Sequence, residues 1–592
     1  ALTTEAAAPA LGRLPTISPA LLTQDYAERA NLWKIRKEIY AIVAGARKSG
    51  TTALLEDIAV PVSNLAQTCS ELRSLFAECG YDDAVIFGHA KDGNLHFLIN
   101  EDFTDPKCVE RYSAFTQALV DIVLKNNGSL KAEHGTGRMM APFVERQFGS
   151  ELYQIMREVK SAFDPQGILN PGVIISDQIN AHINDIKFHP TIEKIADNCV
   201  ECGYCEPICP SKDLTTTPRQ RIVLQRAIAT ANKSQELDLS RKLSEQSQYW
   251  VEESCAADSM CQSSCPLGIN TGALVTELRS HRHSDFAQGI GEIAADHWSS
   301  TTNAVSKLLS LLRSLPSHPI TSLNKSLRTL ISHEYLPLWN SRLPRGGSTR
   351  KTHKSDRPDF VLFTSCLDSI FESHADQALR SLAKKAGLSF VVPDQIADLC
   401  CGTPWKSKGF LDGYQTMIEK THAALLEASN QGAIPIICEN SSCSQGLVEA
   451  LRAVSNSPLK IVDSIDFVAE LILPRLKIVD LLDSVLLHPT CSSTSLGSNP
   501  KLEKIASSLS ASVTIPEDWG CCAFAGDRGL LHPELTRSAT RAEVRSINSH
   551  KHSAYFSTNR TCEIGISQAS GQEFKHILVA LDRQSEPLSG VR

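Results

Sequence analysis

The sequence lacks an excess of positive charge, a long apolar run and a signal-peptide pattern. Its 592 residues carry 59 Lys and Arg against 66 Asp and Glu, and this net charge of −7 argues against a general nucleic-acid binder. Because no run of about 18 apolar residues is present, no membrane-spanning helix is expected. The chain starts at Ala1 rather than at a methionine, which indicates processing or a start partway into a longer protein.

Cysteine, by contrast, is abundant and unevenly distributed. Of 19 cysteines, three are scattered, seven lie in 199–265 and nine lie in 366–562. An odd count without a secretory signal disfavours a disulfide framework. The pattern favours metal or cluster ligation in a reducing, cytoplasmic compartment, either free or peripheral on the inner face of a membrane.

Composition and pattern predict a multidomain α+β protein. A stretch at 298–357 holds ten Lys and Arg against two acidic residues, which is typical of a solvated helical connector or of a surface that docks on an anionic membrane. Residues 298–342 are expected to be helical. The predicted parts are a flexible N-terminal segment (1–24), a mixed α and β domain (25–178), a helical cysteine-rich domain (179–290), a basic connector and linker (291–357) and two α/β units (358–475 and 476–592).

Two histidines flank a turn in the first of these domains. Apolar runs at 84–89 and 94–100 are separated by Lys91-Asp92-Gly93, which predicts a β-hairpin. His89 and His96 then face each other with Cβ atoms about 4.5–5.5 Å apart. With Glu133 and His134 from a later loop, they would form a site for a divalent metal, whereas satisfied structural histidines are the alternative.

Cys199-x2-Cys202-x2-Cys205-x3-Cys209-Pro is a strong [4Fe–4S] signature. A second run keeps the frame, but an aspartate replaces one cysteine: Cys255, Asp258, Cys261, Cys265. In the ferredoxin pattern the runs pair crosswise. Cys265 would complete the first cluster, and Cys209 would join the second. Asp258 is either a hard fourth ligand, which would give a labile iron or a [3Fe–4S] cluster, or a surface residue beside the cluster.

The last third of the chain contains an internal repeat. FVLFTSC (360–366) matches SVLLHPTC (484–491), DLCCGTP (398–404) matches GCCAFAG (520–526), and IICENSSC (436–443) matches YFSTNRTC (555–562). The offsets of 125, 121 and 119 residues indicate two copies of one unit. Each copy starts with a buried-type strand that leads into a cysteine, which predicts α/β layering.

The words GHAKDGNLHFLI, AEHGTGR and FDPQGILNPG resemble the C-terminal domain of FAD-linked oxidases that act on D-2-hydroxy acids. The resemblance implies that His89, His96 and Glu133 bind a divalent metal (Zn or Mn) and that His134 is the catalytic base. It also implies that Arg36 grips the substrate carboxylate, and that Asn170 lines the flavin. Leu98 and Leu55 stand where relatives specific for 2-hydroxyglutarate carry polar or basic groups, which favours a small monocarboxylate such as D-lactate.

The two repeats resemble the cysteine-rich CCG domains of glycolate oxidase iron–sulfur subunits and heterodisulfide reductases. Further iron–sulfur clusters, zinc and structural thiols all remain open here, and Ser557 takes the place of Cys438 in the second copy. The cysteines concerned are Cys366, Cys400, Cys401, Cys438 and Cys443 in the first copy and Cys491, Cys521, Cys522 and Cys562 in the second.

Together the resemblances imply an FAD-dependent D-2-hydroxy-acid dehydrogenase, with D-lactate oxidised to pyruvate as the best interpretation. Two [4Fe–4S] clusters would pass electrons to a quinone, a cytochrome or another carrier. No glycine-rich flavin-cradling domain is seen in the sequence, so we expect the FAD to be held by an upstream domain or a partner subunit. The rival interpretation is a non-catalytic iron–sulfur subunit of a complex that resembles glycolate oxidase.

Overall fold

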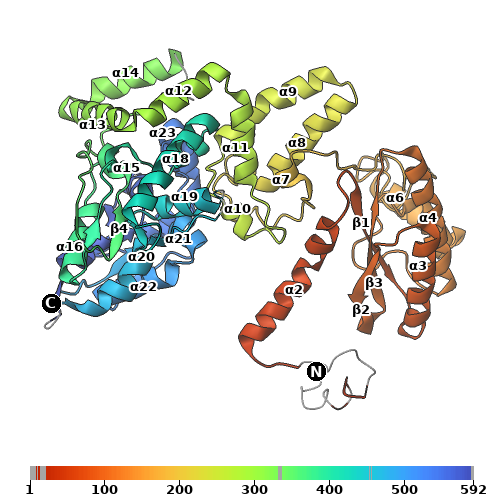
Figure 1. Cartoon of the computed structure of the whole chain (residues 1–592). Helices are drawn as coiled ribbons and strands as arrows, with labels where there is room; N and C mark the ends of the chain where they lie inside the picture. The colour runs from red at the N-terminus through yellow and green to blue at the C-terminus, as the bar shows by residue number, and fades with distance from the viewer. Residues whose placement is uncertain are drawn as a thin grey trace. The chain divides into compact units, whose positions relative to one another are not determined.

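The computed structural model describes residues 22–330, 336–452, 454 and 456–588, together with 9 and 11–13. The chain divides into two compact units, residues 1–202 with 229–235 and residues 203–228 with 236–592 (Figure 1). The mixed helix-and-sheet architecture agrees with the predicted fold class. The flexible segment predicted at 1–24 lies almost wholly outside the described residues.

The first unit contains an antiparallel sheet of three strands in the order β1-β3-β2. The predicted hairpin is confirmed, because His89 pairs with Asn94 across the turn. The prediction that His89 and His96 face each other directly is wrong, because His96 pairs with Phe87, and the two histidines are diagonal neighbours with ring centroids 5.5 Å apart. Gly93 has a φ of +68°, and a Cβ there would lie 1.9 Å from the carbonyl oxygen of Val60, so only glycine fits this turn. The strands are β1 (Thr52–Ala59), β2 (Val85–His89) and β3 (Asn94–Glu101).

Two helices cover one face of this sheet, α3 (Leu65–Cys79) and α4 (Pro106–Lys125). Asp105 caps α4 by accepting from the Lys107 amide, and Pro106 occupies the first helical position; an aspartate followed by a proline is a pattern that predicts a helix start. Phe97 and Phe115 are fully buried in the core between sheet and helices. Because side chains alternate along a strand, the neighbouring positions point to the opposite face, where His96 lies.

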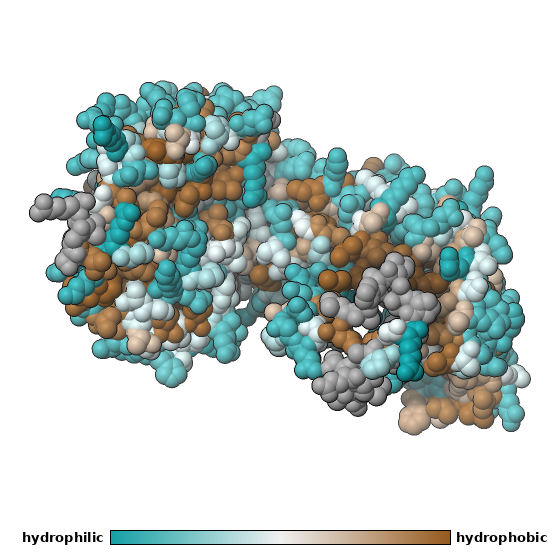
Figure 2. Space-filling model, turned by 60° about the horizontal axis from the view of Figure 1, so that its bottom comes forward, coloured by the Kyte–Doolittle hydropathy of each residue, from teal (hydrophilic) through white to brown (hydrophobic). Residues whose placement is uncertain are grey.

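The rest of the first unit includes helices with exposed apolar side chains. The long helix α2 (Tyr26–Gly45) and the helices α5 (Val144–Phe148) and α6 (Ser150–Phe163) belong to it. Trp33 of α2 is 61% exposed and Phe163 of α6 is 84% exposed. Figure 2 shows one face of the molecule, on which apolar patches alternate with polar ones.

The second unit begins with short helices around the cysteine motifs. The helical prediction for 298–342 holds over α13 and α14 but is wrong at 336–342, where Pro337 lacks the amide that a helix needs. No helix of the described residues is long and apolar enough to cross a membrane. The helices are α9 (Leu237–Ser247), α10 (Met260–Ser263), α11 (Thr271–Arg282), α12 (Asp285–Asp296), α13 (Trp298–Ser314) and α14 (Ser317–Leu330), together with the part of α8 (Pro218–Lys233) up to residue 228.

The internal repeat corresponds to two parallel four-stranded sheets, β5-β4-β6-β7 and β10-β9-β11-β12. One continuous apolar core contains residues of both repeats. The strands are β4 (Phe360–Phe363), β5 (Phe390–Val391), β6 (Ile436–Cys438) and β7 (Ile461–Asp463) in the first, and β9 (Val485–Leu487), β10 (Val513–Thr514), β11 (Ala554–Ser557) and β12 (Phe574–His576) in the second.

The two repeats are joined by hydrogen bonds between equivalent loops. The Ser441 amide donates to the Thr558 carbonyl over 3.2 Å, and the Arg560 amide donates to Asn440 Oδ1 over 2.9 Å. Both loops open a helix, α19 (Ser441–Arg452) and α26 (Arg560–Ser570). The repeats therefore meet at their cysteine-bearing ends.

Candidate functional site

Four side chains with metal-ligand chemistry converge on the sheet face that helices α3 and α4 leave free. One ligand atom from each of Asp57, His96, Glu133 and His134 lies within 4.8 Å of the others. His96 Nε2 is 2.8 Å from Glu133 Oε1, and the rings of His96 and His134 stack with centroids 4.9 Å apart. The structure therefore brings together three of the predicted site residues and adds Asp57.

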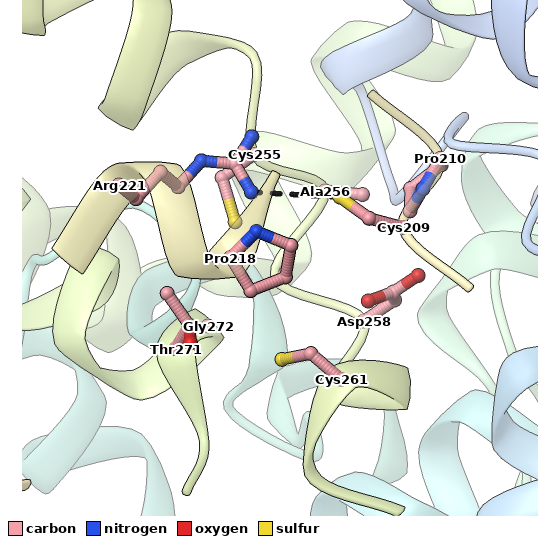
Figure 3. A pocket seen from close by; sticks show the side chains of 10 residues that line it. All are labelled: Cys209, Pro210, Pro218, Arg221, Cys255, Ala256, Asp258, Cys261, Thr271 and Gly272. Atoms are coloured by element: carbon pink, nitrogen blue, oxygen red, sulfur yellow. Dashed lines mark hydrogen bonds between the residues drawn. The ribbon is translucent and has the colours of Figure 1, made fainter. Parts of the chain in front are cut away.

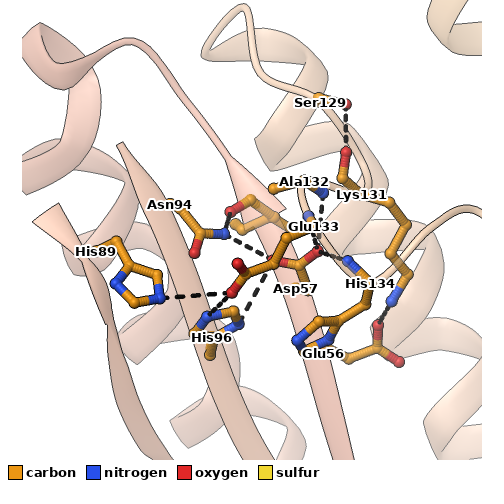
Figure 4. A network of polar contacts seen from close by, with 11 residues as sticks. Glu56, Asp57, His89, Asn94, His96, Ser129, Lys131, Ala132, Glu133 and His134 are labelled. Atoms are coloured by element: carbon orange, nitrogen blue, oxygen red, sulfur yellow. Dashed lines mark hydrogen bonds and ion pairs between the residues drawn. The ribbon is translucent and has the colours of Figure 1, made fainter. Parts of the chain in front are cut away.

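Asp57 fixes the loop that carries Glu133 and His134 (Figure 4). Its Oδ2 accepts the backbone amides of Ala132, Glu133 and His134 over 2.8, 2.8 and 2.9 Å. Its Oδ1 accepts from the Asn94 side chain over 2.6 Å. Burial alone would raise the pKa of Asp57, but the amide donors of His134 and Ala132 outweigh it, so the pKa is lowered and the carboxylate stays ionised.

His89 and Arg36 border the same group of side chains. His89 Nε2 is 3.5 Å from Glu133 Oε1, and these two side chains are 47% and 52% exposed, whereas that of His96 is 4% exposed. The Arg36 guanidinium lies 5.8 Å from the centroid of the Phe87 ring, which is 5.4 Å from that of His96. The site thus has a buried wall and a side open to solvent.

An apolar row adjoins the site on the sheet. Leu55 pairs with Leu98 in the register that also pairs Asp57 with His96, so both leucines share the face of the site, one step along the strands. Asn170 lies in a loop where it has a φ of +43° and where Arg138 Nε donates to the Pro171 carbonyl over 3.2 Å. The predicted flavin contact of Asn170 stays a prediction.

The residues present fit a divalent metal. Imidazole and carboxylate donors suit zinc and manganese, and His89, His96 and Glu133 would supply two nitrogens and an oxygen. His96 Nδ1 lies 3.4 Å from Asp57 Oδ1, so the carboxylate can orient the ring from behind. Burial, opposed by Asp57, lowers the pKa of His96 and favours the neutral imidazole that binds metals.

A second candidate site lies among the cysteine motifs of the second unit. The thiols of Cys209, Cys255 and Cys261 and the carboxylate of Asp258 line one small pocket (Figure 3). Asp258 Oδ2 is shielded from solvent, which speaks against the interpretation as a surface residue. Burial and the neighbouring negative groups raise the pKa of Cys261 to about 12, so this thiol would lose its proton only to a bound metal.

The pocket also contains a buried cation that the sequence analysis missed. Arg221 is 2% exposed, and its Nη1 lies 3.6 Å from the Cys209 sulfur, while Nη2 donates to Ser211 Oγ over 2.7 Å. Burial alone would lower the pKa of Arg221, but its interactions with Cys255 and Cys209 outweigh this effect and raise it. A fixed positive charge beside cluster thiolates stabilises the reduced, more negative cluster.

Cys199 and Cys202 lie in the first unit, and Cys205 and Cys265 lie in the second. Their joint ligation of one cluster stays a prediction.

The cysteines of the first repeat follow the carboxyl ends of its strands, the usual place for sites in parallel sheets. Cys366 Sγ is 3.5 Å from Cys400 Sγ, and Cys401 interacts with both Cys400 and Cys443. The thiols of Cys400 and Cys443 lower the pKa of Cys401, while their own pKa values are raised. The sulfurs of these four cysteines thus contact one another in series. The fifth cysteine, Cys438, lies on β6 and is also buried.

The second repeat has a different donor set. Cys522 interacts with Cys562, which lowers its pKa to about 5, and Cys521 interacts with Cys491. His488, which the sequence analysis did not single out, forms a compact group with Cys522 and Cys562, with the ligand atoms within 4.8 Å of one another.

Comparison with known families assigns these regions. Residues 3–174 match the family "FAD linked oxidases, C-terminal domain", residues 195–269 match the "4Fe-4S dicluster domain", and residues 360–447 and 485–567 match the "Cysteine-rich domain" CCG. The chain therefore combines a region similar to the C-terminal domain of FAD-linked oxidases with regions similar to the 4Fe-4S dicluster domain and, twice, to the CCG domain.

Individual relatives match over part of their length. The glycolate oxidase subunit GlcD of Bacillus subtilis is 37% identical over 133 residues, 22% of this chain and 28% of its own length. The cytochrome D-lactate dehydrogenase of Arabidopsis thaliana mitochondria is 31% identical over 163 residues, which are 27% of this chain and 28% of the length of that protein. The D-2-hydroxyglutarate dehydrogenase of Haemophilus influenzae is 25% identical over 307 residues, and the match covers 43% of this chain and 30% of the length of that protein. The chain thus spans less than a third of each of these relatives.

Proposed function

We propose that this chain oxidises a D-2-hydroxy acid, with D-lactate as the substrate, and exports the electrons through its iron–sulfur centres. The observation that carries the proposal is the convergence of His96, Glu133 and His134 on one half-open sheet face. An electron-transfer subunit needs no such group, although it would account for the cysteine-rich remainder of the chain.

The chain's own residues define the chemistry at this face. Arg36 would bind the substrate carboxylate through two parallel hydrogen bonds, and this would orient the 2-hydroxyl toward the histidines. His134 Nδ1 or Nε2 would accept the hydroxyl proton. When bound, the divalent ion polarises that hydroxyl, and the flavin of this family takes up the hydride.

The apolar row supports a small substrate. Leu55 and Leu98 adjoin the metal-binding group, and a second carboxylate placed over these leucines would be desolvated without a partner. A methyl group would instead be buried favourably. The proposed substrate is therefore the monocarboxylate D-lactate rather than a dicarboxylate.

The route for electrons leaves from the second cluster pocket. The Asp258 carboxyl interacts with the Cys521 side chain, so the pocket borders the second CCG repeat. Electrons from the hydroxy acid would pass singly through the clusters to a quinone or cytochrome. A docking role of the basic helices α13 and α14 on an anionic membrane is also part of this proposal.

The test is the divalent-ion content and turnover of the full-length gene product. We expect an ion other than cluster iron that is lost in the double variant His89→Ala/His96→Ala, together with D-lactate oxidation. Retention of the ion and of turnover in that variant would exclude the proposed site. A purified protein with clusters but without turnover of any 2-hydroxy acid would favour the rival electron-transfer subunit.

A further inference from the structure

We propose that the second CCG repeat holds a single tetrahedral zinc ion bound by His488, Cys522 and Cys562. This site is independent of hydroxy-acid oxidation. The ligand atoms of these three residues lie within 4.8 Å of one another, and all three side chains are buried. In a tetrahedral zinc site neighbouring ligand atoms are roughly 3.3–3.8 Å apart, so a small contraction around the ion suffices.

A buried carboxylate orients the histidine for this role. His488 is 0% exposed, and its Nδ1 lies 2.6 Å from Glu543 Oε1, with the Glu543 side chain 1% exposed. This contact occupies Nδ1 and leaves Nε2, which is shielded from solvent and has no hydrogen-bond partner of ordinary geometry. A histidine that donates one ring N–H to a carboxylate and presents its other nitrogen is the usual arrangement of a metal-bound imidazole.

The thiols supply the soft half of the donor set. Cys522 interacts with both His488 and Cys562, so its sulfur lies between the other two ligands. Cys491, which interacts with Cys521 and Cys562, is the residue that we assign to the fourth position. One nitrogen and three sulfurs form a Cys₃His set, which is typical of closed, structural zinc sites.

The first repeat has a different residue at the position that corresponds to His488. Three residues before its first cysteine it carries Phe363, whereas the second repeat carries His488 three residues before Cys491. Phe363 is buried in the apolar core. The first repeat thus offers a chain of four thiols without the histidine, which suits several metal atoms, and the second offers one compact group, which suits a single ion.

The experiment measures zinc, iron and acid-labile sulfide per chain in the full-length protein. It is carried out in the His89→Ala/His96→Ala background, so that zinc at the oxidase-type site is not counted. We expect one zinc per chain, lost from His488→Ala and Cys562→Ser, with iron and sulfide unchanged. Replacement of the zinc by Co²⁺ should give visible bands of tetrahedral, thiolate-bound cobalt.

Glu543→Gln keeps the shape of the side chain and tests the site without removing a ligand. It should weaken zinc binding about 10–100-fold in competition with a chromophoric chelator. The matched control is His576→Asn, because His576 is also buried in this repeat but caps helix α27 (Ile577–Arg583) by accepting from the Leu578 amide. This variant should bind zinc like the parent protein.

Two results would overturn the proposal. Zinc content and affinity that stay unchanged in His488→Ala, Cys562→Ser and Glu543→Gln would place the ion elsewhere. Loss of iron and sulfide, rather than zinc, from Cys562→Ser would show an iron–sulfur cluster in the second repeat. If His488→Ala fails to fold, the chelator competition with Glu543→Gln decides.

Discussion

The oxidase-type site of the first unit and the cluster pocket of the second differ in the sign of the charge that they bury and in their exposure to solvent. The first has a buried anion, Asp57, behind a half-exposed pair, His89 and Glu133. The second has a buried cation, Arg221, beside three cysteine sulfurs that are themselves buried. A site that exchanges substrate needs an open side, whereas a site that exchanges electrons needs only a fixed potential.

The largest contrast should come from removing the proposed base. His134→Ala should lower D-lactate turnover by about 10²–10⁴-fold, because a positioned base contributes that much. The electron paramagnetic resonance signal of the clusters should stay unchanged, because His134 belongs to the substrate site alone. His182→Gln is the control, since His182 is buried in the same unit but bonds Ser113. Equal turnover in both variants would exclude His134 as the base.

Asp57→Asn should release the loop of the open site. Hydrogen bonds to a charged acceptor contribute about 1.5–3 kcal/mol each, so the loss of charge at this triple acceptor should lower the free energy of unfolding by about 3 kcal/mol. Chemical denaturation checks this value. A variant that binds the divalent ion and unfolds like the parent would show that the loop is held by other contacts.

The same residue predicts an acid transition. The folded-state pKa of Asp57 lies below its ordinary value of 3.8, so its stabilisation is complete above that value and is lost as the pH falls through the folded pKa. Hydrogen exchange of the amides at 132–134 should accelerate below about pH 4 relative to the intrinsic rate. In Asp57→Asn this pH dependence should disappear.

A smaller effect is expected at the cluster pocket of the second unit. Arg221→Gln should lower the potential of the second cluster by roughly 60–130 mV, since a charged hydrogen bond of about 1.5–3 kcal/mol converts to that shift for one electron. Arg221→Lys keeps the charge and should shift the potential less. Redox titration checks both variants, and an equal shift in both would assign the effect to packing rather than charge.

The smallest effect is expected from replacing Asp258, the carboxylate of the cluster pocket. Asp258→Cys should alter the electron paramagnetic resonance signature of one cluster, because a thiolate replaces a harder oxygen ligand. The spectrum of the other cluster serves as the internal control. An unchanged spectrum would show that Asp258 borders the cluster without ligating it.

Local patterns predicted the hairpin, helix α4 and the histidines of the open site, because these depend on residues close in sequence. Asp57 and His488 were missed because their partners lie far along the chain, whereas Arg221 was missed because nothing in a helical pattern distinguishes a buried arginine from an exposed one. Asp57 accepts amides 75–77 residues away, and His488 pairs with Glu543, 55 residues away. One signal was present for His488, namely a polar residue where the first repeat has Phe363 at the end of a buried strand.

The hydrogen bonds between the two CCG repeats bear on how such a duplicated protein can change during evolution. Ser441 is fully buried against the other copy, and a lone copy would leave its amide without the Thr558 carbonyl. Deletion of either copy would therefore damage the survivor. Mutation can still replace the metal-binding side chains of one copy while the other copy keeps its own. Evolution of the pair should therefore favour substitution of ligands in one repeat over deletion of a whole repeat.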